Sequence, residues 1–85
     1  MPEISRFYGI VITINYQEHM PPHFHARYAE HRAAILMSGQ VLAGSLPSRA
    51  LSLVRAWAAL HEAALAADWE RARGDLPLAP IPPLE

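Results

Sequence analysis

The sequence contains no cysteine and no lysine among its 85 residues. Without cysteine it can form neither a disulfide framework nor a thiolate zinc site. All seven basic residues are arginine, which binds phosphate and carboxylate groups in a bidentate manner, although GC-rich coding produces the same bias. The formal net charge is −1 and the isoelectric point is about 6.5, so the strongly basic character typical of nucleic-acid-binding proteins is also missing.

Long apolar runs are absent too. No stretch approaches the roughly 20 residues that a transmembrane helix needs. The first residues, MPEISR, lack the charged start and the apolar segment of a signal peptide. A composition of 52% hydrophobic and 18% charged residues is typical of a globular protein. We therefore expect a single cytoplasmic domain over residues 1–85 that does not bind membranes.

The N-terminal half carries four strand patterns. Each is short and either alternates between apolar and polar positions or is rich in β-branched residues. They cover residues 9–16, 23–28, 32–37 and 40–45. In the first of them, one face collects Ile10, Ile12, Ile14 and Tyr16.

Two short connections set the expected register of the later strands. Residues 29–30 and 38–39 are both expected to form two-residue turns. Phe24 then faces Ile35, and Ile35 in turn faces Leu42. In this register the apolar residues collect on one face of the sheet, and the opposite face is polar and open.

A helical half follows the strands. Apolar residues recur at spacings of three and four over residues 47–73, and so long a helix in so small a domain predicts a break near residues 60–62. Residues 76–85 hold four of the eight prolines and are expected to form an extended strap. The sequence thus predicts an α+β fold. It has an antiparallel sheet of three to four strands, one broken helix or two helices on one face, and a proline-rich C-terminal strap.

Four of the five histidines fall within thirteen positions: His19, His23, His25 and His31. His23 and His25 are two apart on one predicted strand, so their side chains leave the same face with Cα atoms roughly 6.5–7 Å apart. That spacing suits two imidazoles on one divalent metal ion such as zinc or nickel, with His19 or Glu18 as a third ligand. The alternative is a solvated polar face that binds nothing.

The same histidine pair is suited to acid–base chemistry without any cofactor, because one imidazole can accept a proton while the other donates one. Arg27 and Arg32 lie opposite each other on the same predicted face. Such a like-charge pair is unfavourable unless an anion lies between the two side chains. These four residues together favour a metal-independent, ribonuclease-like site, in which the arginines bind the phosphate.

Several blocks of the sequence resemble the bacterial domain-of-unknown-function family 4160. The most specific is PPHFHARY at residues 21–28; others are residues 2–9, Leu46–Pro47, Trp57, Trp69 and residues 81–84. The resemblance implies a small stand-alone bacterial protein, commonly encoded beside a member of unknown-function family 2442 in a toxin–antitoxin arrangement. The residues that it carries over as candidates are His23, His25, Arg27 and Tyr28. Ala29 is a departure, since related sequences often have glycine there.

Three functions remain open on this evidence. The first is a toxin-type component that binds or cleaves RNA through its histidine and arginine face. The second is a non-catalytic module that binds its neighbouring protein, as an antitoxin does, or forms a homodimer through an exposed sheet edge. The third is a metal-binding protein built on the His-x-His pair.

Overall fold

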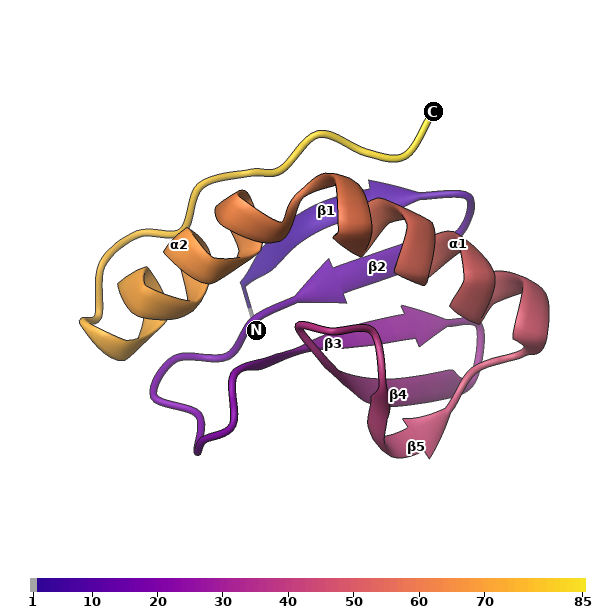
Figure 1. Ribbon diagram of the computed structural model, residues 1–85, viewed down its shortest axis with the longest axis horizontal. Helices are drawn as coiled ribbons and strands as arrows, with labels where there is room; N and C mark the ends of the chain where they lie inside the picture. The colour runs from indigo at the N-terminus through magenta and orange to yellow at the C-terminus, as the bar shows by residue number, and fades with distance from the viewer. Residues whose placement is uncertain (1) are drawn as a thin grey trace.

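Five strands followed by two helices make up the fold in the computed structural model, which describes residues 2–85 (Figure 1). The strands are β1 (Glu3–Phe7), β2 (Ile10–Thr13), β3 (His23–Tyr28), β4 (His31–Leu36) and β5 (Val41–Ser45). They form one antiparallel sheet in the order β1-β2-β3-β4-β5. The helices are α1 (Ser48–Leu60) and α2 (Glu62–Arg73). The α+β class predicted from the sequence is confirmed.

The prediction of three to four strands was wrong by one strand, because it missed β1. This strand pairs with β2 through a tight turn in which Tyr8 and Gly9 have φ values of 48° and 79°. An irregularity between Glu3 and Ser5 interrupts its pairing. The buried residues Ile4 and Phe7 are consequently three apart, so the alternation that marks a strand in the sequence is lost.

The predicted register of the β3–β4 hairpin is confirmed. Phe24 pairs with Ile35, and Arg27 pairs with Arg32. The turn places Ala29 at a φ of 53°, in the left-handed region that glycine adopts without strain. The hairpin thus forms although its turn lacks the glycine expected from the family resemblance.

The expected pairing of Ile35 with Leu42 was wrong. Ile35 pairs with Val41 and Ala34 pairs with Ala43, so Leu42 is an extra residue in β5 and forms a bulge. Its side chain is 48% exposed instead of packing in the core. The following pairs, Ala34–Ala43, Ala33–Gly44 and Arg32–Ser45, keep the expected register, so the error is confined to the turn end of the hairpin. No periodic pattern in the sequence reveals the bulge.

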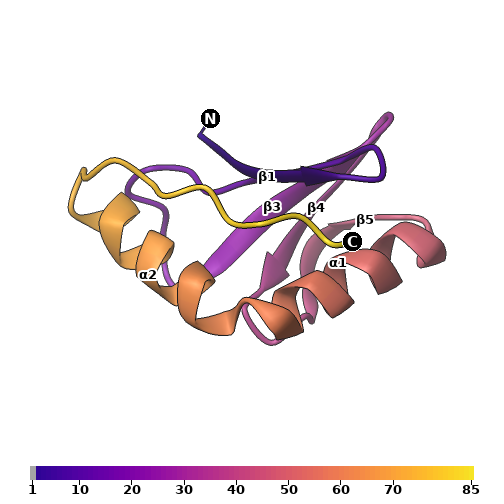
Figure 2. The ribbon, with the colours of Figure 1, turned by 90° about the horizontal axis from the view of Figure 1, so that it is seen from above.

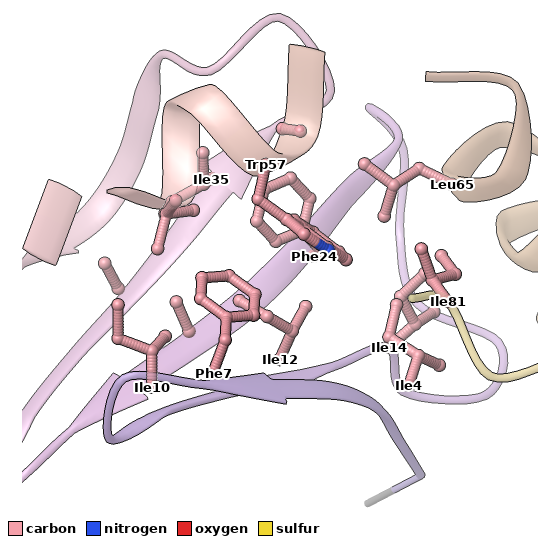
Figure 3. Close-up of a cluster of buried hydrophobic side chains, with 14 of the residues drawn as sticks. Ile4, Phe7, Ile10, Ile12, Ile14, Phe24, Ile35, Trp57, Leu65 and Ile81 are labelled. Atoms are coloured by element: carbon pink, nitrogen blue, oxygen red, sulfur yellow. The ribbon is translucent and has the colours of Figure 1, made fainter. Parts of the chain in front are cut away.

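The core lies between one face of the sheet and the two helices (Figure 3). Trp57 of α1 is fully buried at its centre, where its ring packs against Phe7 at 5.4 Å and against Phe24 at 5.9 Å. Ile10, Ile12 and Ile14 are buried on this face as expected, but Tyr16 is 42% exposed. Tyr16 lies beyond the end of β2, so the strand alternation no longer determines its direction.

The predicted helix break occurs at His61, the single residue between α1 and α2. The C-terminal segment 76–85 then runs back past the helices to the β1 edge as an extended strap, as Figures 1 and 2 show. The Ile81 N–H donates to the Ile4 carbonyl at 2.8 Å, and the Trp57 indole N–H donates to the Pro82 carbonyl at 2.9 Å. Within the described residues, neither helix has both the length and the apolar character needed to cross a membrane.

Candidate functional site

The face of the sheet opposite the helices carries a groove of about 500 Å³. Small apolar residues, including Val11, Ala34 and Ala43, form part of its lining. Its polar lining residues are Glu3, Thr13, Asn15, His25, Arg27 and Arg32. The face that was expected to be open is therefore not covered by the helices and is concave, but its lining mixes polar side chains with a larger apolar surface.

Arg27 and Arg32 are directly opposite each other across β3 and β4, and both are exposed. Directly opposite side chains start with Cβ atoms roughly 4.5–5.5 Å apart. Within residues 2–85 neither guanidinium forms an ion pair, whereas Glu3 in the same groove is held by two hydrogen bonds from Arg6, at 2.8 and 3.0 Å. The groove thus has an excess of positive charge at the Arg27–Arg32 pair.

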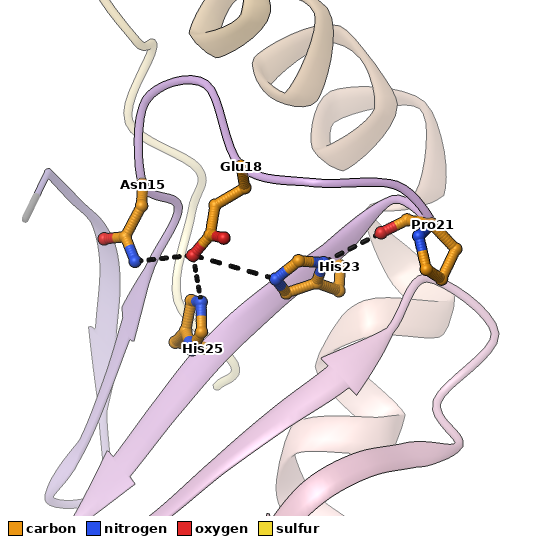
Figure 4. A network of polar contacts seen from close by, with 5 residues as sticks. All are labelled: Asn15, Glu18, Pro21, His23 and His25. Atoms are coloured by element: carbon orange, nitrogen blue, oxygen red, sulfur yellow. Dashed lines mark hydrogen bonds and ion pairs between the residues drawn. The ribbon is translucent and has the colours of Figure 1, made fainter.

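Three side chains meet where the loop 14–22 passes over the start of β3 (Figure 4). The His25 Nε2 lies 2.9 Å from Glu18 Oε1, and the His23 Nε2 lies 3.8 Å from the same oxygen. One ligand atom from each of the three residues lies within 4.8 Å of the other two. The two imidazole rings pack edge to face, with centroids 5.1 Å apart.

The loop is held in place by α2 and by its own side chains. The Gln17 N–H donates to the Ala72 carbonyl at 3.3 Å, and the Gln17 side chain donates to Asp75 at 2.7 Å. Asn15 Nδ2 donates to Glu18 Oε1 at 2.8 Å. This hydrogen bond and the one from His25 lower the pKa of the Glu18 carboxyl from its ordinary value, so a negative charge is favoured at the centre of the cluster.

His23 is more enclosed than His25. Its ring packs against the Trp69 ring of α2 at 5.4 Å, and its Nδ1 lies 2.8 Å from the Pro21 carbonyl oxygen. A carbonyl only accepts, so Nδ1 must carry the proton of that hydrogen bond. In the neutral ring Nε2 therefore has a free lone pair, and this atom faces Glu18.

The other sequence candidates lie elsewhere. His19 is exposed and outside the three-residue cluster, in which Glu18 supplies the third group. Tyr28 points to the opposite face of the sheet from His25 and lines a separate pocket with Tyr8 and Leu84. Arg32 shares the groove with Arg27 and His25, as predicted.

Two supporting residues, Glu3 and Gln17, were not among the sequence candidates, and the contact of Asn15, a residue expected to border the site, with Glu18 was not predicted. Glu3 reaches the groove from β1, the strand that was not predicted. Asn15 orients Glu18, and the spacing of three between these two loop residues is the one signal in the sequence. Gln17 holds the loop through a hydrogen bond to Ala72, which lies far along the chain. No local sequence pattern predicts this long-range contact.

Comparison with protein-family models matches residues 9–70 to the family described as a domain of unknown function, DUF4160. The chain belongs to this family. The resemblance noted in the sequence is thereby confirmed, while the neighbouring gene and the toxin role that it implied stay predictions. Comparison with curated proteins and with solved structures found no match.

The DUF4160 match contains the whole Glu18–His23–His25 cluster and both groove arginines. Strand β1, with Glu3, lies before the matched segment, and the strap lies after it. The family domain thus comprises four of the five strands, α1 and most of α2.

Proposed function

We propose that this protein binds RNA in the groove on the open face of its sheet, as the toxin-type component of a two-protein module. The observation that carries the proposal is the Arg27–Arg32 pair. Two guanidiniums directly opposite each other repel, and a phosphate group between them turns that repulsion into two charge-assisted, bidentate hydrogen bonds. The proposed protein partner is the product of the neighbouring gene, a member of unknown-function family 2442, which would neutralise the toxin.

The net charge of −1 counts against strong general attraction to RNA, but affinity for a phosphate backbone depends mainly on the charges that face it. In the groove, the single carboxylate of Glu3 is engaged by Arg6, and this hydrogen bond lowers the Glu3 pKa. Arg27 and Arg32 then remain for the ligand. An overall charge near zero also predicts weak non-specific binding, so most of the affinity should depend on these two residues.

The test is binding of a fluorescent single-stranded RNA of about 20 nucleotides, followed by anisotropy over a range of salt concentrations. For single strands each neutralised phosphate contributes about −0.7 to the slope of log K against log salt concentration. Arg27→Ala/Arg32→Ala removes the one phosphate contact shared by the two arginines, so it should reduce the magnitude of the slope by about 0.7 and weaken binding at low salt. Arg49→Ala/Arg73→Ala is the matched control. It removes the same charge from exposed positions on α1 and α2. Equal effects of the two double substitutions would reject the groove as the RNA site.

A second candidate function is metal-free cleavage of the bound RNA, which the hydrogen bond between Glu18 and His25 favours. A carboxylate that holds one ring nitrogen leaves the other for proton transfer. In this reaction a ribose 2′-hydroxyl attacks the adjacent phosphorus, and a base takes the hydroxyl proton. The bond to the 5′-oxygen then breaks as that oxygen receives a proton. The products are a 2′,3′-cyclic phosphate and a 5′-hydroxyl end.

Cleavage is tested by incubating labelled RNA with the protein in the presence of a chelator. The predicted function requires cyclic-phosphate products from the wild type and their loss in His25→Ala. Binding without any cleavage would leave the protein as an RNA-binding module and remove the catalytic candidate.

A further inference from the structure

We propose that Glu18, His23 and His25 form a binding site for a divalent transition-metal ion of the zinc or nickel class. The inference rests on the geometry of three side chains and not on RNA binding. It goes beyond the proposed function, because it assigns a ligand to the end of the groove at which His25 lies.

The separations of the donor atoms fit one shared ion. An ion bound at about 2.0–2.1 Å in a tetrahedral site holds its ligand atoms roughly 3.3–3.4 Å apart. Glu18 Oε1 lies 2.9 Å from His25 Nε2 and 3.8 Å from His23 Nε2, values on either side of that separation. The donor atoms of the two histidines lie within 4.8 Å of each other, so a shared ion requires them to move closer together.

The orientation of His23 is the one that metal-ligating histidines show. Such a histidine almost always donates its second ring N–H to a carbonyl or a carboxylate, which fixes the tautomer. The His23 Nδ1–H donates to the Pro21 carbonyl at 2.8 Å, so the lone pair of Nε2 points at Glu18. Packing against Trp69 further restricts the ring.

The carboxylate is likewise held from outside the cluster. Asn15 Nδ2 donates to Glu18 Oε1, and the Gln17 contact with α2 fixes the backbone beside it. The cluster is also reached from solvent, because the side chains of Glu18 and His25 are 23% and 29% exposed, while that of His23 is 8% exposed. An ion held by three protein ligands at such a position keeps an open coordination site, as catalytic zinc ions do.

The donor set selects the class of metal. Two imidazole nitrogens and one carboxylate oxygen suit zinc and nickel, whereas magnesium and calcium prefer oxygen ligands throughout. The His25 Nε2 cannot bind an ion and keep its hydrogen bond to Glu18. Metal loading and the metal-free cleavage described above therefore exclude each other, while the Arg27–Arg32 pair stays available in both cases.

The experiment is calorimetric titration of the full-length protein with Zn²⁺, Ni²⁺ and Mg²⁺, after dialysis against a chelator. We expect one Zn²⁺ or Ni²⁺ per chain and no binding of Mg²⁺. His25→Ala and Glu18→Gln should each weaken binding by roughly tenfold or more, since loss of even a supporting residue costs 10–100-fold. His19→Ala is the matched control, an exposed histidine of the same loop outside the cluster, and should change the affinity less than twofold.

His23→Ala leaves a gap beside Trp69, so this variant is not used to decide the outcome. Circular dichroism is recorded for every variant, and the partly exposed positions Glu18 and His25 decide the test. The proposal would be overturned if neither Zn²⁺ nor Ni²⁺ formed a one-to-one complex with the protein. It would also be overturned if His19→Ala weakened metal binding as much as His25→Ala and Glu18→Gln do. RNA anisotropy on the same samples separates the two proposals. Glu18→Gln should lose metal affinity and retain RNA affinity. Arg27→Ala/Arg32→Ala should lose RNA affinity and retain metal affinity.

Discussion

The Nε2 atom of His25 lies 2.9 Å from Oε1 of Glu18, and two independent parts of the fold produce this contact. Pairing of β3 with β2 and β4 fixes the histidine. The bond from Gln17 to Ala72 fixes the loop that carries the carboxylate. The chemistry of the cluster therefore depends on the docking of α2 as much as on the strand that supplies the histidines.

The first prediction concerns toxicity. Inducible expression in a bacterial host without the neighbouring gene should arrest growth, and His23→Ala/His25→Ala should relieve the arrest, because both candidate groups for chemistry are removed. Folded yield is measured for both proteins, with His25→Ala alone as the milder variant. Arrest that persists in a folded double variant would keep the toxin role and exclude the histidines. No arrest by the wild type would instead favour the non-catalytic binding partner.

A second prediction concerns the turn between β3 and β4. Ala29 has a φ of 53°, which costs an L-residue roughly 1–2 kcal/mol relative to glycine. Ala29→Gly should raise the free energy of unfolding by about 0.5–1 kcal/mol after the entropy of the unfolded glycine is counted. The melting temperature should rise by roughly 2–8 °C. Ala56→Gly, at an exposed position in α1, is the control and should destabilise by about 1 kcal/mol. A decrease in both variants would contradict the left-handed turn.

The fold was predictable where a local pattern determined it. Alternation in residues 23–37 gave the β3–β4 register, and the length of the helical segment indicated the break at His61. Strand β1 and the bulge at Leu42 were not predictable, because each adds an irregular residue that disrupts a period of two. Long-range pairing, not local propensity, stabilises both features.

The candidate site was predictable to a similar extent. The spacing of His23 and His25 placed both rings on one face, and the register placed Arg27 opposite Arg32. The choice between His19 and Glu18 was left open, because loop residues follow no period. The hydrogen bond from Asn15 to Glu18 and the hydrogen bond from Gln17 to Ala72 of α2 place Glu18, and not His19, beside the two histidines.

A third prediction concerns Gly44, where β5 approaches β4 beside the arginine pair. Its φ is 75°, and a Cβ added there would lie 2.3 Å from the Arg32 carbonyl oxygen, so backbone must move. Gly44→Ala should destabilise by roughly 2–4 kcal/mol in chemical unfolding. Gly74→Ala is the control, because its φ is ordinary and its nearest contact is 3.7 Å, and it should change stability by less than about 0.5 kcal/mol. Similar stabilities for the two variants would show that β5 does not approach Arg32 this closely.

The last prediction tests the proline-rich strap. Ile81 is 4% exposed and its N–H donates to the Ile4 carbonyl on the β1 edge, so its side chain and backbone both join the strap to the domain. Ile81→Ala should lower the free energy of unfolding by about 2–4 kcal/mol, through lost apolar burial and the cavity left behind. Leu76→Ala removes an equally large side chain from a position 55% exposed in the same segment, and should cost less than about 0.5 kcal/mol. Urea denaturation measures both. Equal, small losses would mean that the segment does not pack on the sheet in solution, and that the Trp57–Pro82 hydrogen bond alone cannot hold it there.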